Sequence, residues 1–123
     1  MILVDTSVWV DHLRTGEQLL IQTLQANSVL IHPFVIGELA CGNLQDRDAV
    51  LALLGALPRA ALADEQEVLF FISQQKLMGR GIGYIDIHLL ASAAISGKAM
   101  LWTRDTRLHK VAQAMGLAYT EAH

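Results

Sequence analysis

Residues 1–13 read MILVDTSVWVDHL, and this stretch decides the fold class that we expect. Ile2 to Val4 are apolar without a helical period, which is typical of a short buried strand. The expected strand covers residues 2–5 and therefore ends on the carboxylate of Asp5. From Ser7 onward the apolar residues follow a helical spacing. A strand that runs directly into a helix is typical of the start of an α/β fold.

The rest of the chain continues to alternate extended and helical segments. This alternation predicts an α/β fold with a small, mainly parallel sheet. The expected strands after the first are residues 29–31, 60–62 and 99–102. The expected helices after the first lie around residues 19–24, 33–42, 46–57, 68–77, 87–96 and 105–115, with Asp64 and Glu67 forming a capping box before the fourth of these.

Length and composition suit one compact domain that covers residues 1–123. Hydrophobic residues make up 53% of the chain and charged residues only 17%. This apolar excess predicts either an unusually full core or an apolar face that a partner covers, such as a second copy of the chain. The segments around Leu19–Leu24 and Val50–Leu57 are the candidates for such a face.

Several functional classes are disfavoured by the sequence. It contains no apolar run long enough to span a membrane and no secretory signal pattern at its start. The single cysteine, Cys41, excludes an internal disulfide and fits a reducing cytoplasm, and we expect it to be a small buried thiol. The formal net charge of −3 argues against a surface that coats nucleic acid generally. It leaves open an enzyme that handles nucleic acid locally, with bound cations offsetting its acids.

Two carboxylates follow predicted strands. Asp5 ends the first strand, and Asp105 lies just beyond the strand that contains MLWT. Ligand sites in parallel α/β sheets form outside the carboxyl ends of the strands. We therefore expect Asp5 and Asp105 at the same edge of the sheet. Either residue can also be a simple helix N-cap.

Two further carboxylates interrupt apolar helical segments. Glu38 lies in HPFVIGELACG and Asp86 in GIGYIDIHLLASA, each with mostly apolar neighbours three and four positions away. An ionised carboxylate in such surroundings loses hydration free energy unless another group compensates it. A divalent cation, Mg²⁺ or Mn²⁺, fits these hard oxygen ligands, whereas no Cys/His spacing suggests zinc. The alternatives are a buried arginine beside Glu38 and a helix-dipole role for Asp86.

Other polar residues have weaker predictions. Thr6, Ser7 and Thr103 can orient the acids by hydrogen bonds, or they can be turn residues. Asp11 lies near Arg14 on its predicted helix, which favours a solvated ion pair, and His88 is expected at the surface or an interface. Arg104, Arg107 and Lys110 flank Asp105 and can contact phosphates, although such a face is usually just solvated. Trp9 and Trp102 are expected in the core.

Four segments together resemble a known family. VDTSVWVD, PFVIGELACG, GIGYIDIHLLASA and WTRDTRL occur in the order seen in PIN-domain ribonucleases, and more narrowly in VapC-type toxins of bacterial toxin–antitoxin modules. The resemblance covers essentially the whole chain. Leu108 departs mildly from the pattern, because many relatives carry an aromatic residue there, which affects packing more than chemistry.

The resemblance implies a fold, an activity and partners. It implies a three-layer α/β/α domain, usually a homodimer, that cleaves RNA and is inhibited by a cognate antitoxin. It places Asp5, Glu38, Asp86 and Asp105 in an acidic site that binds Mg²⁺ or Mn²⁺. Thr6 and Thr103 fall where the family often uses hydroxyls to support the acids.

Three alternatives compete with a nuclease. A phosphoaccepting receiver domain also gathers acids at strand ends, but it needs a central strand that ends in an aspartate, and DRDAVLALLGALPRA is helical. A haloacid-dehalogenase-type phosphatase needs a second acid two residues after Asp5, where this chain has Ser7. A non-catalytic binding module on the same fold remains the main alternative, which the loss of an acid would favour.

Overall fold

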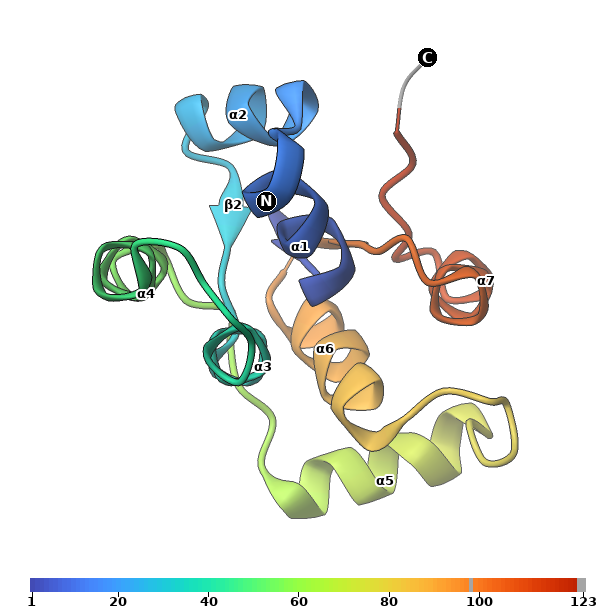
Figure 1. Cartoon of the computed structure of the whole chain (residues 1–123). Helices are drawn as coiled ribbons and strands as arrows, with labels where there is room; N and C mark the ends of the chain where they lie inside the picture. The colour runs from blue at the N-terminus through green and yellow to red at the C-terminus, as the bar shows by residue number, and fades with distance from the viewer. Residues whose placement is uncertain (98, 122–123) are drawn as a thin grey trace.

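The structure is a computed structural model that describes residues 1–97 and 99–121. In these residues the chain forms a small sheet surrounded by helices (Figure 1). The strands are β1 (Ile2–Val4), β2 (Val29–Leu30) and β3 (Met100–Trp102). The helices are α1 (Thr6–Thr15), α2 (Gln18–Gln25), α3 (Pro33–Ala40), α4 (Arg47–Gly55), α5 (Glu65–Gln75), α6 (Tyr84–Ile95) and α7 (Thr106–Ala114).

The three strands form a parallel sheet in the order β2-β1-β3. This confirms the predicted α/β class, and with helices packed around the sheet the domain has three α/β/α layers. The prediction of a strand at residues 60–62 is wrong. In the described part of the chain, this region makes only one bridge, between Ile31 and Arg59, before it leaves the sheet towards α5.

Helix α6 runs through the middle of the molecule, whereas α4 and α7 lie on opposite sides of it (Figure 1). Every residue from Ile87 to Ala93 is buried, so α6 has no solvent-facing side over two turns. His88 is therefore 7% exposed, and the expectation that it lies at the surface is wrong. The predicted core positions of Trp9 and Trp102 are confirmed.

Helix ends agree with most capping signals in the sequence. The Asp64–Glu67 capping box forms, with hydrogen bonds of 3.0 and 2.8 Å between each side chain and the other residue's backbone N–H. Helix α6 begins at Tyr84, three residues before the predicted start, so Asp86 lies in its first turn. Cys41 is exposed, contrary to expectation, because it caps the C-terminus of α3 where the chain leaves the core.

None of the helices in the described ranges is long and apolar enough to cross a membrane.

Candidate active site

The register of the sheet brings Asp5 next to Thr103. Val4 pairs with Trp102, and the Asp5 N–H donates to the Trp102 carbonyl at 2.8 Å. The Thr103 hydroxyl then donates to Asp5 Oδ2 at 2.7 Å, and the Ser7 hydroxyl donates to the same oxygen at 2.8 Å. Asp5 is only 5% exposed. Two hydroxyls thus fix the orientation of a buried carboxylate at the carboxyl end of β1.

Asp5 occupies the N-cap position of α1 without capping the helix. Its side chain accepts no hydrogen bond from the backbone of α1. Both of its side-chain hydrogen bonds go to Oδ2, and no described residue donates a hydrogen bond to Oδ1. The capping alternative therefore does not account for this carboxylate.

Glu38 approaches the same edge from α3. The Thr6 hydroxyl donates to Glu38 Oε1 at 2.6 Å, which ties the first residue of α1 to α3. Glu38 is exposed, as are its helical neighbours Phe34 and Cys41, so the predicted desolvation of this carboxylate is wrong. Among the described residues no arginine or lysine forms an ion pair with Glu38, which leaves the buried-arginine alternative without support.

Asp86 is half-buried in the first turn of α6. The Gly83 N–H donates to Asp86 Oδ2 at 3.2 Å. Burial raises the pKa of Asp86, the Gly83 hydrogen bond opposes this, and the charges of Asp5, Asp105 and Glu38 raise the pKa further. The mutual repulsion shows that the fold brings all four predicted acids into one electrostatic neighbourhood.

Asp105 is exposed and performs the capping role that was one of its two alternatives. Its Oδ1 accepts a hydrogen bond from the Leu108 N–H at 2.9 Å at the start of α7. Its own N–H donates to the Thr103 hydroxyl at 3.1 Å. Since Oδ2 receives no hydrogen bond from a described residue, capping uses only half of this carboxylate.

The four carboxylates share one pattern. In each, one oxygen is held by a hydrogen bond and the other receives none from the described residues; the free oxygens are Asp5 Oδ1, Glu38 Oε2, Asp86 Oδ1 and Asp105 Oδ2. None of the four forms an ion pair with a described lysine or arginine. The set is therefore oriented, negatively charged and without a compensating cation from the described chain.

The chemistry of these donors suits a hard divalent cation. No three Asp, Glu, His or Cys side chains in residues 1–97 and 99–121 are close enough to enclose an ion by themselves. Carboxylate oxygens are the ligands that Mg²⁺ prefers, and it is often held by one or two of them while waters or substrate phosphates complete its shell. A closed structural site such as a zinc tetrahedron does not fit.

Arg104 lies beside this site, and its side chain is fully engaged elsewhere. Its guanidinium forms ion pairs with Asp11 at 2.7 Å, with Glu121 at 2.6 Å and with Glu17. These carboxylates raise the pKa of Arg104 well above its usual range. The predicted ion pair of Asp11 exists, but its partner comes from the far end of the chain instead of Arg14.

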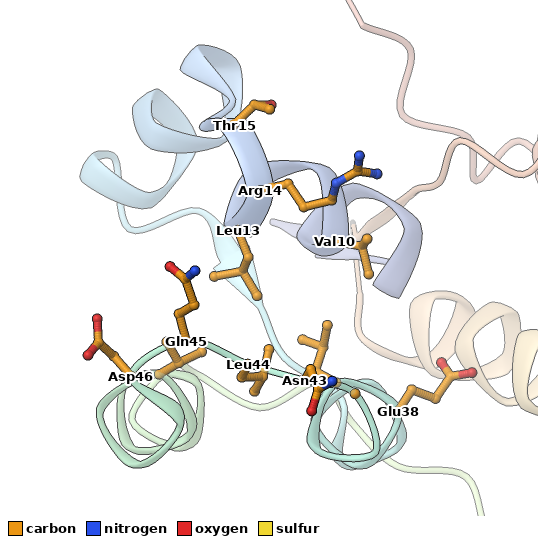
Figure 2. Close-up of a pocket in the computed structure, with 12 residues that line it drawn as sticks. Val10, Leu13, Arg14, Thr15, Glu38, Asn43, Leu44, Gln45 and Asp46 are labelled. Carbon is orange, nitrogen blue, oxygen red and sulfur yellow. The ribbon is translucent and has the colours of Figure 1, made fainter.

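A cleft of about 760 Å³ opens between α1 and the segment that joins α3 to α4 (Figure 2). Leu13 points from α1 towards the loop that carries Asn43 to Asp46, and Glu38 lies at the edge of the cleft in Figure 2. A smaller apolar pocket of about 230 Å³ adjoins it, sharing Leu13 and Val50. A hydrophobic groove therefore leads from α4 to one of the four acids.

Sequence comparison agrees with this arrangement. Residues 2–114 match the PIN domain family, and the chain belongs to that family. Its relatives include two proteins named Ribonuclease VapC32, from Mycobacterium tuberculosis strains CDC 1551 / Oshkosh and ATCC 25618 / H37Rv. Each is 45% identical over 121 residues, which cover 98% of this chain and 98% of the relative.

Proposed function

We propose that the protein is a metal-dependent endoribonuclease toxin whose site consists of Asp5, Glu38, Asp86 and Asp105. One observation carries this proposal: four oriented carboxylates gather at the edge of the sheet, each with one free oxygen and none with a basic partner among the described residues. The likeness to two ribonucleases over nearly the whole chain supports the same activity.

The four carboxylates have different tasks in this proposal. Buried Asp5, fixed by two hydroxyls, is the principal ligand, with Asp86 and Asp105 beside it. Exposed Glu38, held by Thr6, would hold a second ion or orient the attacking water from the side of α3. A bound Mg²⁺ or Mn²⁺ activates water and neutralises the scissile phosphate.

The chain's own residues define the remaining chemistry. The acidic edge repels RNA phosphates when no cation is bound, so binding and cleavage both require the metal. No histidine or serine nucleophile is needed for attack by water, and the expected products carry a 5′-phosphate and a 3′-hydroxyl. The reaction takes place in the cytoplasm, where RNA is available and the exposed Cys41 stays reduced.

The test is cleavage of structured RNAs by the native protein and its Asp5→Asn variant, with Mg²⁺, Mn²⁺ or chelator. We expect cleavage only by the native protein with metal. Glu65→Gln is the matched control, because Glu65 is an exposed acid on α5 that makes no contact with the site, and this variant should cleave normally. Equal activity of Asp5→Asn would contradict the site, and folded native protein that binds metal without cleaving any RNA would favour the non-catalytic binding module.

We further propose that the groove between α1 and α4 receives a helix of the cognate antitoxin. Trp9, Leu13, Leu24 and Leu54 line its apolar part, and Leu53 is 70% exposed at its rim. An apolar helix face fits such a groove, and a basic side chain that continues towards Glu38 would meet the unpaired acids.

Leu53→Lys tests this docking surface. We expect the variant to lose antitoxin binding in a co-purification while keeping its ribonuclease activity. Leu62→Lys is the control, because Leu62 is also exposed, at 49%, but does not line the groove. Equal retention of the antitoxin by all three proteins would contradict the proposed groove.

The homodimer is a separate proposal. Helix α5 exposes Leu69 by 53% and Phe70 by 66%, which is unusual for large apolar side chains. We place the dimer contact there, away from the groove. Light scattering should give the mass of two chains for the native protein and of one chain for Phe70→Glu; a native monomer would contradict it.

A further inference from the structure

The turn after β3 is held by a charge cluster outside the proposed metal site. Arg104 forms ion pairs with three acids: Asp11 from α1, Glu17 from the loop after α1, and Glu121 from the C-terminal segment. Its Nε and Nη2 both donate to Glu121 Oε1, at 3.0 and 2.6 Å. The Trp102 ring N–H donates to the same Glu121 oxygen at 2.9 Å. Glu121 thus accepts hydrogen bonds from two side chains, one at the end of β3 and one in the turn that follows it.

The backbone of Arg104 connects this cluster to Asp5. The Arg104 N–H donates to the Ser7 hydroxyl at 3.0 Å, and that hydroxyl donates onward to Asp5 Oδ2 at 2.8 Å. The preceding residue, Thr103, donates to the same Asp5 oxygen. The position of the 103–104 backbone therefore sets both hydrogen bonds that orient the buried carboxylate.

The C-terminal segment is built into the sheet edge. The Leu101 N–H donates to the Leu117 carbonyl at 2.7 Å, and the Tyr119 N–H donates to the Leu101 carbonyl at 2.9 Å. The rings of Trp102 and Tyr119 lie 5.1 Å apart. These residues follow position 114, where the match to the PIN domain family ends. The arrangement is thus supplied by a part of this chain that the family pattern does not cover.

We propose that residues 117–121 act as a latch that positions Asp5, with Glu121 and Arg104 as its positioning residues. The Arg104 and Glu121 side chains are 29% and 32% exposed, and ion pairs with this much solvent contact add little to folding stability. Their contribution is geometric, since a planar guanidinium with three acid partners fixes the turn in one place. The effect on catalysis rests on the proposed ribonuclease function.

The test uses the full chain with Glu121→Ala, which removes the acceptor of Arg104 and Trp102, with Arg104→Lys and with the double variant. Without metal, NMR should show faster amide hydrogen exchange at Arg104, whose N–H then loses its steady contact with Ser7. With metal, kcat should fall about 10- to 100-fold, the range for residues that orient metal ligands, while KM stays unchanged. The double variant should be no worse than the poorer single variant, because both act through one unit. Glu65→Gln should match the native protein in both measurements.

The two readouts separate the possible failures. Unchanged exchange at Arg104 in Glu121→Ala would overturn the latch. Faster exchange with unchanged kcat would overturn its positioning role and leave a purely structural contact. If the native protein cleaves no RNA, the ribonuclease proposal fails, and the exchange measurement still decides whether the latch exists.

Discussion

Two groups of carboxylates lie on either side of the short turn 103–105, and the protein treats them in opposite ways. Asp11, Glu17 and Glu121 surround a single guanidinium, that of Arg104. The other group has no basic partner among the described residues, although one of its members is buried. That group consists of Asp5, Glu38, Asp86 and Asp105.

The difference separates acids that are neutralised within the described chain from acids that have no basic partner there. The first group is compensated within the chain, so its charges cost little. In the second group, burial and the neighbouring acids raise the pKa of Asp86, which means that its ionised carboxylate opposes folding; the cation that we propose would offset this cost. His32 illustrates a third solution, because this buried side chain stays neutral.

The largest expected effect separates the two roles of Asp105. Asp105→Asn keeps an oxygen for the Leu108 N–H but removes the charge, so we expect ribonuclease activity to fall more than about 100-fold, with stability retained. A loss of this size exceeds the range for residues that only orient metal ligands. Asp105→Ala should lose the same activity and also about 1 kcal/mol of stability with the cap. RNA cleavage and urea unfolding measure both quantities. Activity in Asp105→Asn close to the native value would leave this residue with a capping role only.

The next effect concerns His32 and pH. Burial, followed by the charges of His88 and Arg59, lowers the pKa of His32 from 6.5 to about 4. Its Nδ1 accepts a hydrogen bond from the Phe34 N–H at 3.0 Å, which requires the neutral ring. Between pH 6.5 and pH 4, the unfolded chain therefore binds a proton at His32 that the folded chain does not bind. The free energy of unfolding consequently falls by about 3 kcal/mol as the pH is lowered through this range.

Replacing this histidine sharpens that prediction. His32→Asn keeps an acceptor for the cap of α3 but cannot titrate, so it should lose about 3 kcal/mol less than the native protein between pH 7 and pH 4. Urea unfolding at the two pH values gives the difference directly. An equal loss in both proteins would mean that His32 does not contribute to acid sensitivity.

A smaller loss is expected at Thr103, which supports Asp5 from β3. Thr103→Val removes the hydroxyl that donates to Asp5 Oδ2 while keeping the shape of the buried side chain, so kcat should fall about 10- to 100-fold. Thr103→Ser keeps the hydroxyl and should retain most activity. If the valine variant were as active as the serine variant, the orientation of Asp5 would not depend on this bond.

The smallest expected effect is on stability, and it compares one acid that is paired with Arg104 with one acid that has no basic partner among the described residues. Without metal, Asp11→Asn should lower the free energy of unfolding by no more than about 1 kcal/mol, because solvent screens this ion pair, in which Asp11 is 41% exposed. Asp86→Asn should raise it, because the amide keeps the Gly83 hydrogen bond and removes the repulsion. Thermal melts in chelator show whether each variant is less or more stable than the native protein. Destabilisation by Asp86→Asn would contradict the view that this acid opposes folding.

Local patterns in the sequence predicted much of the fold and the positions of the acids. An apolar run before Asp5 and another before Asp105 placed both residues at one sheet edge, since parallel strands end together. Helical spacing predicted most helices to within a few residues. The strand at residues 60–62 failed because an apolar triplet carries no information about whether a neighbouring edge is free.

The charge cluster could not be predicted, because its contacts are distant in sequence. Arg104 lies 93 positions from Asp11, 87 from Glu17 and 17 from Glu121, and no local pattern joins them. The predicted exposure of His88 and the predicted burial of Cys41 were wrong for a related reason. The burial of one and the exposure of the other depend on how α6 and α3 pack, which residue type alone does not decide.

A calorimetric titration with Mn²⁺ tests most directly the central claim, that the four unpaired carboxylates bind a metal ion. The native protein and Glu65→Gln should bind the ion with the same affinity, whereas Asp5→Asn and Asp86→Asn should bind it far more weakly. That result would show that the unpaired carboxylates form a metal site. Equal affinities in all four proteins would contradict the account, because the ion would then bind somewhere else.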